Sequence, residues 1–341
     1  MSEGRDDEVD AGTDVDADAT GGTDVETANN VEAAIDATRD VVVIGGGPAG
    51  CSAAVFVARY GLDAVVFDRG PAALRRCAYL ENYLGFPAGI DVDTFHELIH
   101  EHVERAGCAL RSELVEAVER VEDDGPTPDD ARFVVETDEG RRVAAAYVIA
   151  AAWYDGSYLR TLDDDAMFEE HEHHGELEER FDPEYPDEDG RTPFEGLYVA
   201  SPAGQRSAQA IVAAGNGAHV ARCLLEDHRI ARGYPEGVAT EYDWLRRDGE
   251  FSGEWAERDR WREWFENEAG EDHDLDDDRL EELRERYIDR AFETRLTDAE
   301  AESRADGGVE RLVDVLGPER VLDAIDDATI EKYAEGSRDA R

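Results

Sequence analysis

Residues 40–68 read DVVVIGGGPAGCSAAVFVARYGLDAVVFD, and this stretch decides the fold that the sequence predicts. Val41 to Ile44 are four consecutive β-branched residues followed directly by glycines, a pattern typical of a buried strand in a parallel sheet. A helix from about Pro48 to Tyr60 and a second apolar strand, Ala64 to Phe67, complete a βαβ unit. The sequence therefore predicts an α/β fold with a parallel central sheet.

The glycines after the first strand form the motif G-x-G-x-x-G at Gly45, Gly47 and Gly50. In such a motif one glycine permits a tight turn, one gives the backbone access to a pyrophosphate, and one allows helix and strand to pack closely. Pro48 and Ala49 belong to the start of the helix, whose unpaired N–H groups and positive dipole end favour a bound phosphate. We expect this turn to bind a dinucleotide, and the alternative is a merely structural turn.

The second strand ends at Asp68, where a carboxylate can accept hydrogen bonds from an adenosine ribose. Strand, glycines, helix, strand and acid thus follow one another in the order of a dinucleotide-binding unit. Arg69, the next residue, has two interpretations: a contact to a 2′-phosphate or, as we expect, a solvated arginine.

The composition is strongly acidic. The 341 residues include 85 Asp and Glu against 35 Lys and Arg, which gives a formal net charge of −50, and Lys332 is the only lysine. Such a surface repels nucleic acid and anionic membranes, so neither is an expected partner. This composition resembles that of proteins from halophilic archaea. We therefore expect folding to require molar salt, which screens the repulsion between the carboxylates.

The sequence predicts a cytoplasmic protein. The acidic start contains no secretory signal, and no apolar stretch reaches membrane-spanning length. The cysteines form neither a C-x-x-C pair nor a metal-ligand spacing, and disulfides are not expected in a reducing compartment. They are Cys51, Cys77, Cys108 and Cys223.

Beyond the βαβ unit the pattern changes from helical to strand-like. A helix is expected over about 92–106, followed by a meander of short strands and a returning buried strand. The expected strands are 109–111, 114–121, 133–136, 141–143 and 147–151, with a turn at 123–130.

Two later stretches carry a resemblance to a known family. Residues 80–90, LENYLGFPAGI, and residues 196–218, GLYVASPAGQRSAQAIVAAGNGA, resemble segments of thioredoxin reductases that pass the flavin of FAD. The resemblance implies an FAD-binding domain with a parallel sheet and a βββ meander. It also implies that Asn82, Ser201 and Gln209 lie at the flavin end, with Gln209 beside the N1–C2=O edge of the ring.

The chain departs from that family at three places. Ser201 stands where the family has the aspartate that holds the ribityl chain, and Ala151-Ala152-Trp153 replaces its Ala-Thr-Gly. Residues 154–192 lie where the family inserts an NADPH domain with a second glycine motif and a C-x-x-C, and they are too few to form one.

These observations predict four regions. They are a disordered acidic tail, a discontinuous FAD-binding domain, an acidic connector in place of an NADPH domain, and a helical extension. The expected ranges are 1–38 for the tail, 39–153 with 193–234 for the domain, 154–192 for the connector and 240–335 for the extension. Aromatic residues at helical spacing in the extension indicate a packing surface rather than a cofactor box. They either cover the face left bare by the missing domain or form a homodimer interface. The last amphipathic stretch is expected to break at Gly317-Pro318.

The function expected from this resemblance is that of an FAD-dependent oxidoreductase, with NAD(P)H from solvent, a protein or a small reductant as the donor. The alternative is a non-catalytic flavin- or nucleotide-binding sensor or scaffold. Cys77 lies nine residues after Asp68, close to where single-cysteine coenzyme A-disulfide reductases and NADH oxidases carry a redox thiol. It is therefore the candidate catalytic residue, and a small buried hydrophobe is the other interpretation.

Two groups of histidines are candidate functional residues. His171, His173 and His174 lie among glutamates that together could hold a divalent ion, but a solvated acidic loop or helix is the expected interpretation and no metal site is predicted. His96, His100 and His102, on or near the helix at 92–106, are expected to be surface residues rather than acid–base groups.

Overall fold

The computed structural model describes residues 34–70, 73–121, 130–152, 156–162, 165–173, 176–201, 209–240, 242, 244–271 and 273–339. The chain divides into two units, residues 1–34 and 35–341, and the description below concerns the second. Most of the predicted acidic tail, most of the predicted turn at 123–130, and Trp153 and His174 lie outside the described residues.

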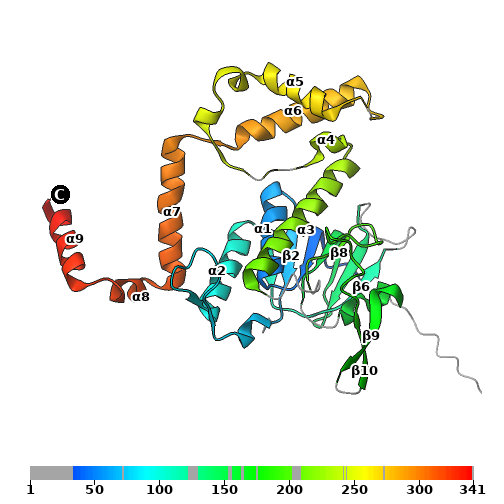
Figure 1. The fold of residues 1–341 in the computed structure, drawn as a ribbon, viewed down its shortest axis with the longest axis horizontal. Coiled ribbons are helices and arrows are strands. Elements are labelled where there is room, and N and C mark those ends of the chain that lie inside the picture. Colours follow the sequence, from blue (N-terminus) through cyan, green and yellow to red (C-terminus); the bar gives the residue numbers. More distant parts are fainter. Residues whose placement is uncertain are drawn as a thin grey trace, which may run out of the picture. The chain divides into compact units, whose positions relative to one another are not determined.

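A seven-stranded sheet forms the centre of this unit (Figure 1). Its parallel strands are β1 (Ala37–Ile44), β2 (Ala64–Phe67), β5 (Ala109–Arg111), β8 (Arg142–Ala150) and β11 (Leu197–Val199). They run in the order β5-β2-β1-β8, and β11 pairs with β8 beyond this path. In the central register Val43 lies between Val66 and Ile149. The α/β fold with a parallel sheet is therefore confirmed.

The antiparallel part of the sheet is a meander of β6 (Val115–Arg120), β7 (Phe133–Thr137) and β8. The strands expected separately at 141–143 and 147–151 are one strand, β8, and that expectation was wrong. The segment that joins the two halves of β8 consists of alanines, so no turn residue interrupts the strand. Their small side chains fit between packed layers. Residues 142–145 of β8 pair with β7, and residues 148–150 pair with β11.

The helices and the meander pack on opposite faces of the parallel strand β1. Val41 and Val43 of β1 pack against α1 (Pro48–Tyr60) and α3 (Ala210–Ala231), with α2 (Val92–Arg105) beside them. Val42 and Ile44 point to the other face, where they pack with β6, β7 and the short helix η2 (Ser157–Leu162). This alternation buries both faces of β1, as its continuous apolar sequence predicts.

The acidic connector contains a β-hairpin, so the expected loop or helix was wrong. After η3 (Asp165–Met167), strand β9 (Phe168–His173) pairs antiparallel with β10 (Glu176–Phe181). Phe168 lies opposite Phe181, and Glu169 accepts hydrogen bonds from Arg180 across the pair. Such cross-strand pairs stabilise a hairpin that its charged composition alone does not predict. The side chains of His171 and His173 lie outside what the structure describes.

Short elements complete the region before α2: η1 (Ala73–Arg76), β3 (Tyr79–Leu80) and β4 (Ile90–Asp91). The C-terminal extension is helical, as expected. Its elements are α4 (Glu236–Ala239), β12 (Arg246–Arg247), η5 (Asp248–Glu250), η6 (Gly253–Ala256), α5 (Arg258–Ala269), α6 (Asp277–Glu293), β13 (Arg295–Leu296), α7 (Asp298–Leu316), α8 (Pro318–Asp323) and α9 (Asp327–Asp339). The predicted break at Gly317-Pro318 separates α7 from α8. None of the helices in the described residues has the length and apolar content needed to cross a membrane.

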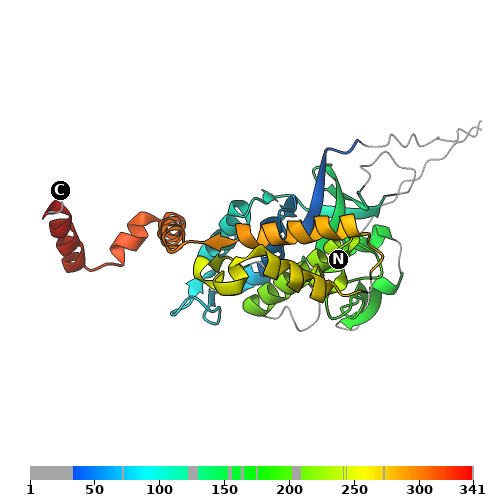
Figure 2. The same cartoon turned by 90° about the horizontal axis from the view of Figure 1, so that it is seen from above.

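Helices α5 and α6 pack side by side (Figure 2), and their aromatic residues are packing surface. Phe265 and Leu283 are fully buried between them, while Trp261 stacks on Phe251 with ring centroids 5.6 Å apart. On the outside, Glu285 of α6 accepts hydrogen bonds from Arg262 of α5 at 2.7 and 2.9 Å. The two helices are therefore joined by apolar packing and by the ion pair between Arg262 and Glu285, which is called the clamp below.

The clamp predicts a pH-dependent stability. Hydrogen bonds from Arg262 lower the pKa of Glu285 to about 2 from its ordinary 4.5. A carboxylate with a lowered pKa stabilises the folded state above its unfolded pKa, and this contribution is lost as the pH falls from about 4.5 to about 2. Glu285→Gln is expected to cost about 1 kcal/mol at pH 7. The difference from the unmodified protein should vanish in that acid range.

Tryptophan fluorescence during chemical unfolding measures this effect, because four of the five tryptophans, residues 244, 255, 261 and 264, lie in this region. Glu281→Gln is the matched control: its carboxylate is 67% exposed and lies 3.8 Å from Arg284. Equal losses from Glu281→Gln and Glu285→Gln at pH 7 would contradict the assignment of the clamp.

Candidate functional site

A cavity of about 540 Å³ opens at the glycine turn, next to the ends of β1 and β2. It brings together residues from distant parts of the chain, and nine of the eleven site residues predicted from the sequence are among them. The predicted residues that line it are Gly45, Gly47, Pro48, Ala49, Asp68, Arg69, Cys77, Ser201 and Gln209. Gly50 and Asn82 are not among its lining residues.

The three motif glycines have different surroundings. Gly45 has a φ of +109°, and a Cβ on it would lie 2.8 Å from the backbone of Ala151. A Cβ on Gly50 would lie 1.9 Å from the carbonyl oxygen of Gly45, which leaves no room for a side chain. A Cβ on Gly47 would have no atom within 4 Å. Gly45 and Gly50 therefore serve the packing of the turn, and Gly47 keeps the cavity open.

The start of α1 is suited to an anion. Gly47 at the N-cap has no side chain to occupy the first N–H groups, Pro48 follows it, and the first turn holds no acidic residue. The unpaired N–H groups and the positive dipole end therefore stay available at the cavity. Arg69 and Arg76 also line this cavity, so its cationic side chains complement a phosphate.

Asp68 occupies the position predicted for it, at the end of β2 and in the cavity wall. Its side chain is 11% exposed and packs over Gly46, where a Cβ would lie 2.5 Å from Asp68 Cβ. Arg69 lines the cavity with a side chain that is 60% exposed, and its Nη1 lies 3.8 Å from Asp138 Oδ2.

The residues assigned by resemblance to the flavin end lie close together. Asn82 Nδ2 donates a hydrogen bond of 2.7 Å to Gln209 Oε1, joining segments 127 positions apart in the sequence. Gln209 is the residue before α3, and Ser201 is buried at the end of β11. The sequence did not predict this hydrogen bond, because nothing local links the two segments.

Sequence reasoning missed Glu113, a buried carboxylate that lines the cavity. It accepts hydrogen bonds from Arg141 Nε at 2.9 and 3.0 Å and from Thr137 Oγ1 at 2.8 Å. Since the arginine balances its charge, Glu113 does not oppose an anion in the cavity. Its position between strands gave no recognisable signal in the sequence.

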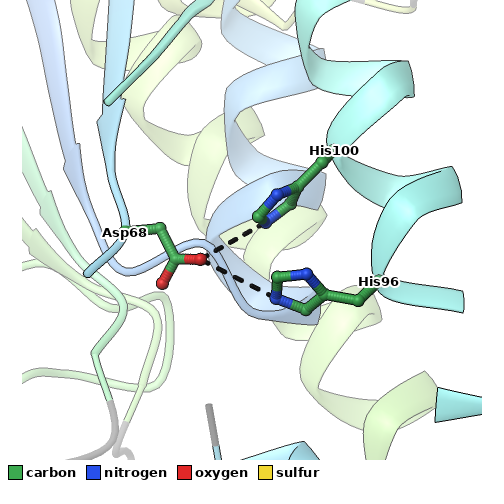
Figure 3. Close-up of side chains that lie close together, drawn as sticks. All are labelled: Asp68, His96 and His100. Atoms are coloured by element: carbon green, nitrogen blue, oxygen red, sulfur yellow. Dashed lines mark ion pairs between the residues drawn. The ribbon is translucent and has the colours of Figure 1, made fainter. Parts of the chain in front are cut away.

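The expectation that His96 and His100 are surface residues was wrong. His96 is 8% exposed and the side chain of His100 is 20% exposed, and both face Asp68 (Figure 3). They lie four positions apart on α2, so one helix face presents both rings. Burial and the neighbouring His100 lower the pKa of His96. His102 is exposed, as expected.

A sequence signal for this pair existed. Residues 96–100 read HELIH, and H-E-x-x-H on a helix places two imidazoles on one face with the spacing of metal ligands. The third member, Asp68, comes from another element, so no contiguous pattern contains the whole cluster.

The four cysteines are free thiols. Cys51 and Cys108 are buried, and burial raises the pKa of Cys108 to about 12. Burial also raises the pKa of Cys223 to about 11. Cys77 is exposed and is the cysteine that lines the cavity, so the interpretation of Cys77 as a small buried hydrophobe was wrong.

Residues 39–152 match the family described as pyridine nucleotide-disulphide oxidoreductase. This range contains the βαβ unit, the meander and most of the cavity wall. The match supports the family resemblance drawn from the motifs, and it covers about a third of the chain.

Curated relatives are similar over a comparable part of the chain. A bifunctional thioredoxin reductase/thioredoxin of Mycobacterium leprae is 35% identical over 134 residues, which are 39% of this chain and 28% of that protein. A thioredoxin reductase of Mycolicibacterium smegmatis is 35% identical over 115 residues, 33% of this chain and 35% of that protein. A thiamine thiazole synthase of Sulfolobus acidocaldarius is 31% identical over 36% of this chain and 40% of that protein. The chain therefore matches less than half the length of each of these relatives.

Solved structures give a further comparison. A thioredoxin reductase from Gloeobacter violaceus aligns with a TM-score of 0.43 and 17% identity over 57% of this chain and 96% of that one. The atypical thioredoxin reductase TRi from Desulfovibrio vulgaris Hildenborough aligns with a TM-score of 0.42 and 21% identity over 56% of this chain and 98% of that one.

Proposed function

We propose that this protein is an FAD-dependent oxidoreductase of the thioredoxin reductase-like type and that FAD binds in the cavity at the glycine turn. The observation that supports this most is the composition of the cavity wall. One cavity is lined by the glycine turn, which is of the kind that binds a pyrophosphate, by Asp68 at the end of β2 and by Gln209 before α3. In the family that the chain resembles, these three features hold the two ends of FAD.

The chain's own residues would divide the binding between them. The start of α1 offers N–H groups to the pyrophosphate, and Asp68 offers a carboxylate to the adenosine ribose. Asn82, Ser201 and Gln209 would hold the flavin end, where the bond between Asn82 and Gln209 fixes both amides. Bound FAD would supply the redox chemistry, while the protein binds and orients it and excludes water.

The electron donor we propose is NAD(P)H that reaches the flavin from solvent.

Ser201 stands where the resembled family uses an aspartate, and a neutral hydroxyl makes a weaker hydrogen bond to the ribityl chain than a carboxylate does. We therefore expect FAD to be held less tightly than in that family, so purification should include added FAD.

A visible absorption spectrum tests the function. The protein is purified in molar salt, mixed with FAD, freed of excess cofactor and recorded before and after anaerobic addition of NADH or NADPH. A yellow protein whose flavin bands bleach confirms the oxidoreductase. If the flavin is retained but neither NADH nor NADPH bleaches it, only the non-catalytic sensor or scaffold remains. A protein that retains no flavin would overturn the proposal.

Cys77 is the candidate redox thiol beside the flavin. If it exchanges electrons with the flavin, Cys77→Ser should slow reoxidation of the reduced protein by a small disulfide by more than about 10-fold. Cys223→Ser is the control, because Cys223 does not line the cavity. Equal reoxidation rates in the two variants would remove Cys77 from the mechanism.

A further inference from the structure

Three side chains with metal-ligating atoms meet behind the cavity wall. Asp68 Oδ2 lies 3.7 Å from His96 Nε2 and 3.4 Å from His100 Nε2. Figure 3 shows both rings on α2 directed at this one oxygen from the same side. The three ligand atoms lie within 4.8 Å of one another.

We propose that Asp68, His96 and His100 form a binding site for a divalent transition-metal ion such as Zn²⁺. Two imidazoles and one carboxylate are a donor set that Zn²⁺ and Fe²⁺ accept. Ligands about 2.1 Å from a tetrahedral ion are about 3.4 Å apart, close to the two separations seen here. The proposal does not depend on the binding of FAD.

The state of His96 is the second observation that points to a cation. The residue is 92% buried, and its Nε2 has no hydrogen-bond partner among the residues that the structure describes. The nearest anionic atom, Asp68 Oδ2 at 3.7 Å, lies beyond the 2.7–3.2 Å of an ordinary hydrogen bond. A buried ring nitrogen without a partner is costly, and a metal ion between the two atoms would satisfy both.

His100 shows what must change when a cation binds. Its Nε2 lies 3.0 Å from the carbonyl oxygen of Gly46, so without a metal this nitrogen can donate a hydrogen bond. As a ligand it must offer its lone pair, and the neutral ring then carries its proton on Nδ1. The released Gly46 carbonyl still accepts from Cys51 Sγ at 3.1 Å. When His100 turns from the Gly46 carbonyl to a metal ion, that carbonyl oxygen therefore keeps a hydrogen-bond donor.

The site is compatible with the proposed role of Asp68 in the cavity. In Figure 3 the rings approach Oδ2, and the second carboxylate oxygen points away from them. One oxygen can thus face α2 while the other faces the cavity. A bound ion would fix α2 to the end of β2, and we expect it to raise the melting temperature of cofactor-free protein.

Titration with Co²⁺ alone tests the site, because its visible spectrum reports tetrahedral coordination and the chemical type of the ligands. The protein is stripped with a chelator, freed of cofactor and titrated in molar salt. Excess Mg²⁺ is present to occupy the acidic surface. A Zn²⁺-displaceable spectrum without thiolate charge transfer is expected. His96→Gln and His100→Gln should each weaken binding by more than about 100-fold.

Two matched variants complete the experiment. His102→Gln alters an exposed histidine of the same helix. His219→Gln alters a second group of possible ligands, Asp189, His219 and Cys223. Both should bind Co²⁺ within about 2-fold of the unmodified protein. The proposal is overturned if no tetrahedral spectrum forms, if His102→Gln weakens binding as much as His96→Gln, or if only His219→Gln removes the spectrum. Melting curves of the metal-free variants establish folding, and His100→Gln, at a less buried position, keeps the test valid if His96→Gln does not fold.

Discussion

Replacement of Gly217 by alanine is expected to lower the free energy of unfolding by about 3 kcal/mol, the largest loss among the substitutions considered. Gly217 lies in α3 where this helix crosses α1. A Cβ there would be 1.9 Å from the carbonyl oxygen of Ala49 and 2.7 Å from its carbonyl carbon. These are backbone atoms at the start of α1, held by the glycine turn, so the two helices must move apart. Chemical unfolding in molar salt measures the loss.

Gly215 is the matched control because it lies on the same helix, two positions away. It is exposed, and a Cβ on it would have no atom within 4 Å. Gly215→Ala should therefore stabilise the protein by up to about 1 kcal/mol, since alanine is the better helix former. The two substitutions are chemically identical and are expected to have opposite signs. Loss of stability of similar size in both would show that helix contact at Gly217 is not the cause.

The second large effect concerns cofactor binding. Gly47→Val should weaken the affinity for FAD by more than about 100-fold, because its side chain would enter the space where the proposed pyrophosphate lies. The backbone of Gly47 has φ −78° and ψ −176°, which valine adopts without strain. The cost to folding should stay within about 1 kcal/mol, the loss of a preferred N-cap residue. Fluorescence quenching of added FAD measures the affinity.

Gly50→Ala provides the contrast within the same motif. Its Cβ would lie 1.9 Å from the carbonyl oxygen of Gly45, so it should destabilise the protein whether or not FAD is present. Gly47→Val should weaken FAD binding strongly while its cost to folding stays within about 1 kcal/mol. If Gly47→Val retains full affinity for FAD in a folded protein, the cavity at the glycine turn is not the pyrophosphate site.

The helix and the second strand of the first βαβ unit were predicted to the residue, whereas β1 begins at Ala37, before the expected 41–44 and inside the range expected for the acidic tail. The expected helix at 48–60 and strand at 64–67 have the bounds of α1 and β2. Both depend on signals within the segment itself: continuous apolar residues, glycines at the turn and a glycine at the helix end. The same is true of the break between α7 and α8, which a Gly-Pro pair specifies.

The expectations that were wrong concern contacts between segments. Whether 141–151 forms one strand or two depends on β7 and β11, which pair with different halves of β8. The hairpin β9–β10 is stabilised across strands, and His96 and His100 face Asp68, the residue that follows β2. Periodicity within one segment cannot report such partners. In the candidate site, it therefore predicted the glycine turn and Asp68 but neither the histidine pair nor Glu113.

The helix layer over β1 affects how the protein folds during its synthesis on the ribosome. Helix α3 closes over α1, yet the chain must reach residue 231 before α3 is complete. Until then, the nascent chain exposes the apolar side chains that α3 will cover. We therefore expect chains arrested before residue 210 to be bound by chaperones and cut rapidly by proteases, and those arrested well beyond 231 to resist both.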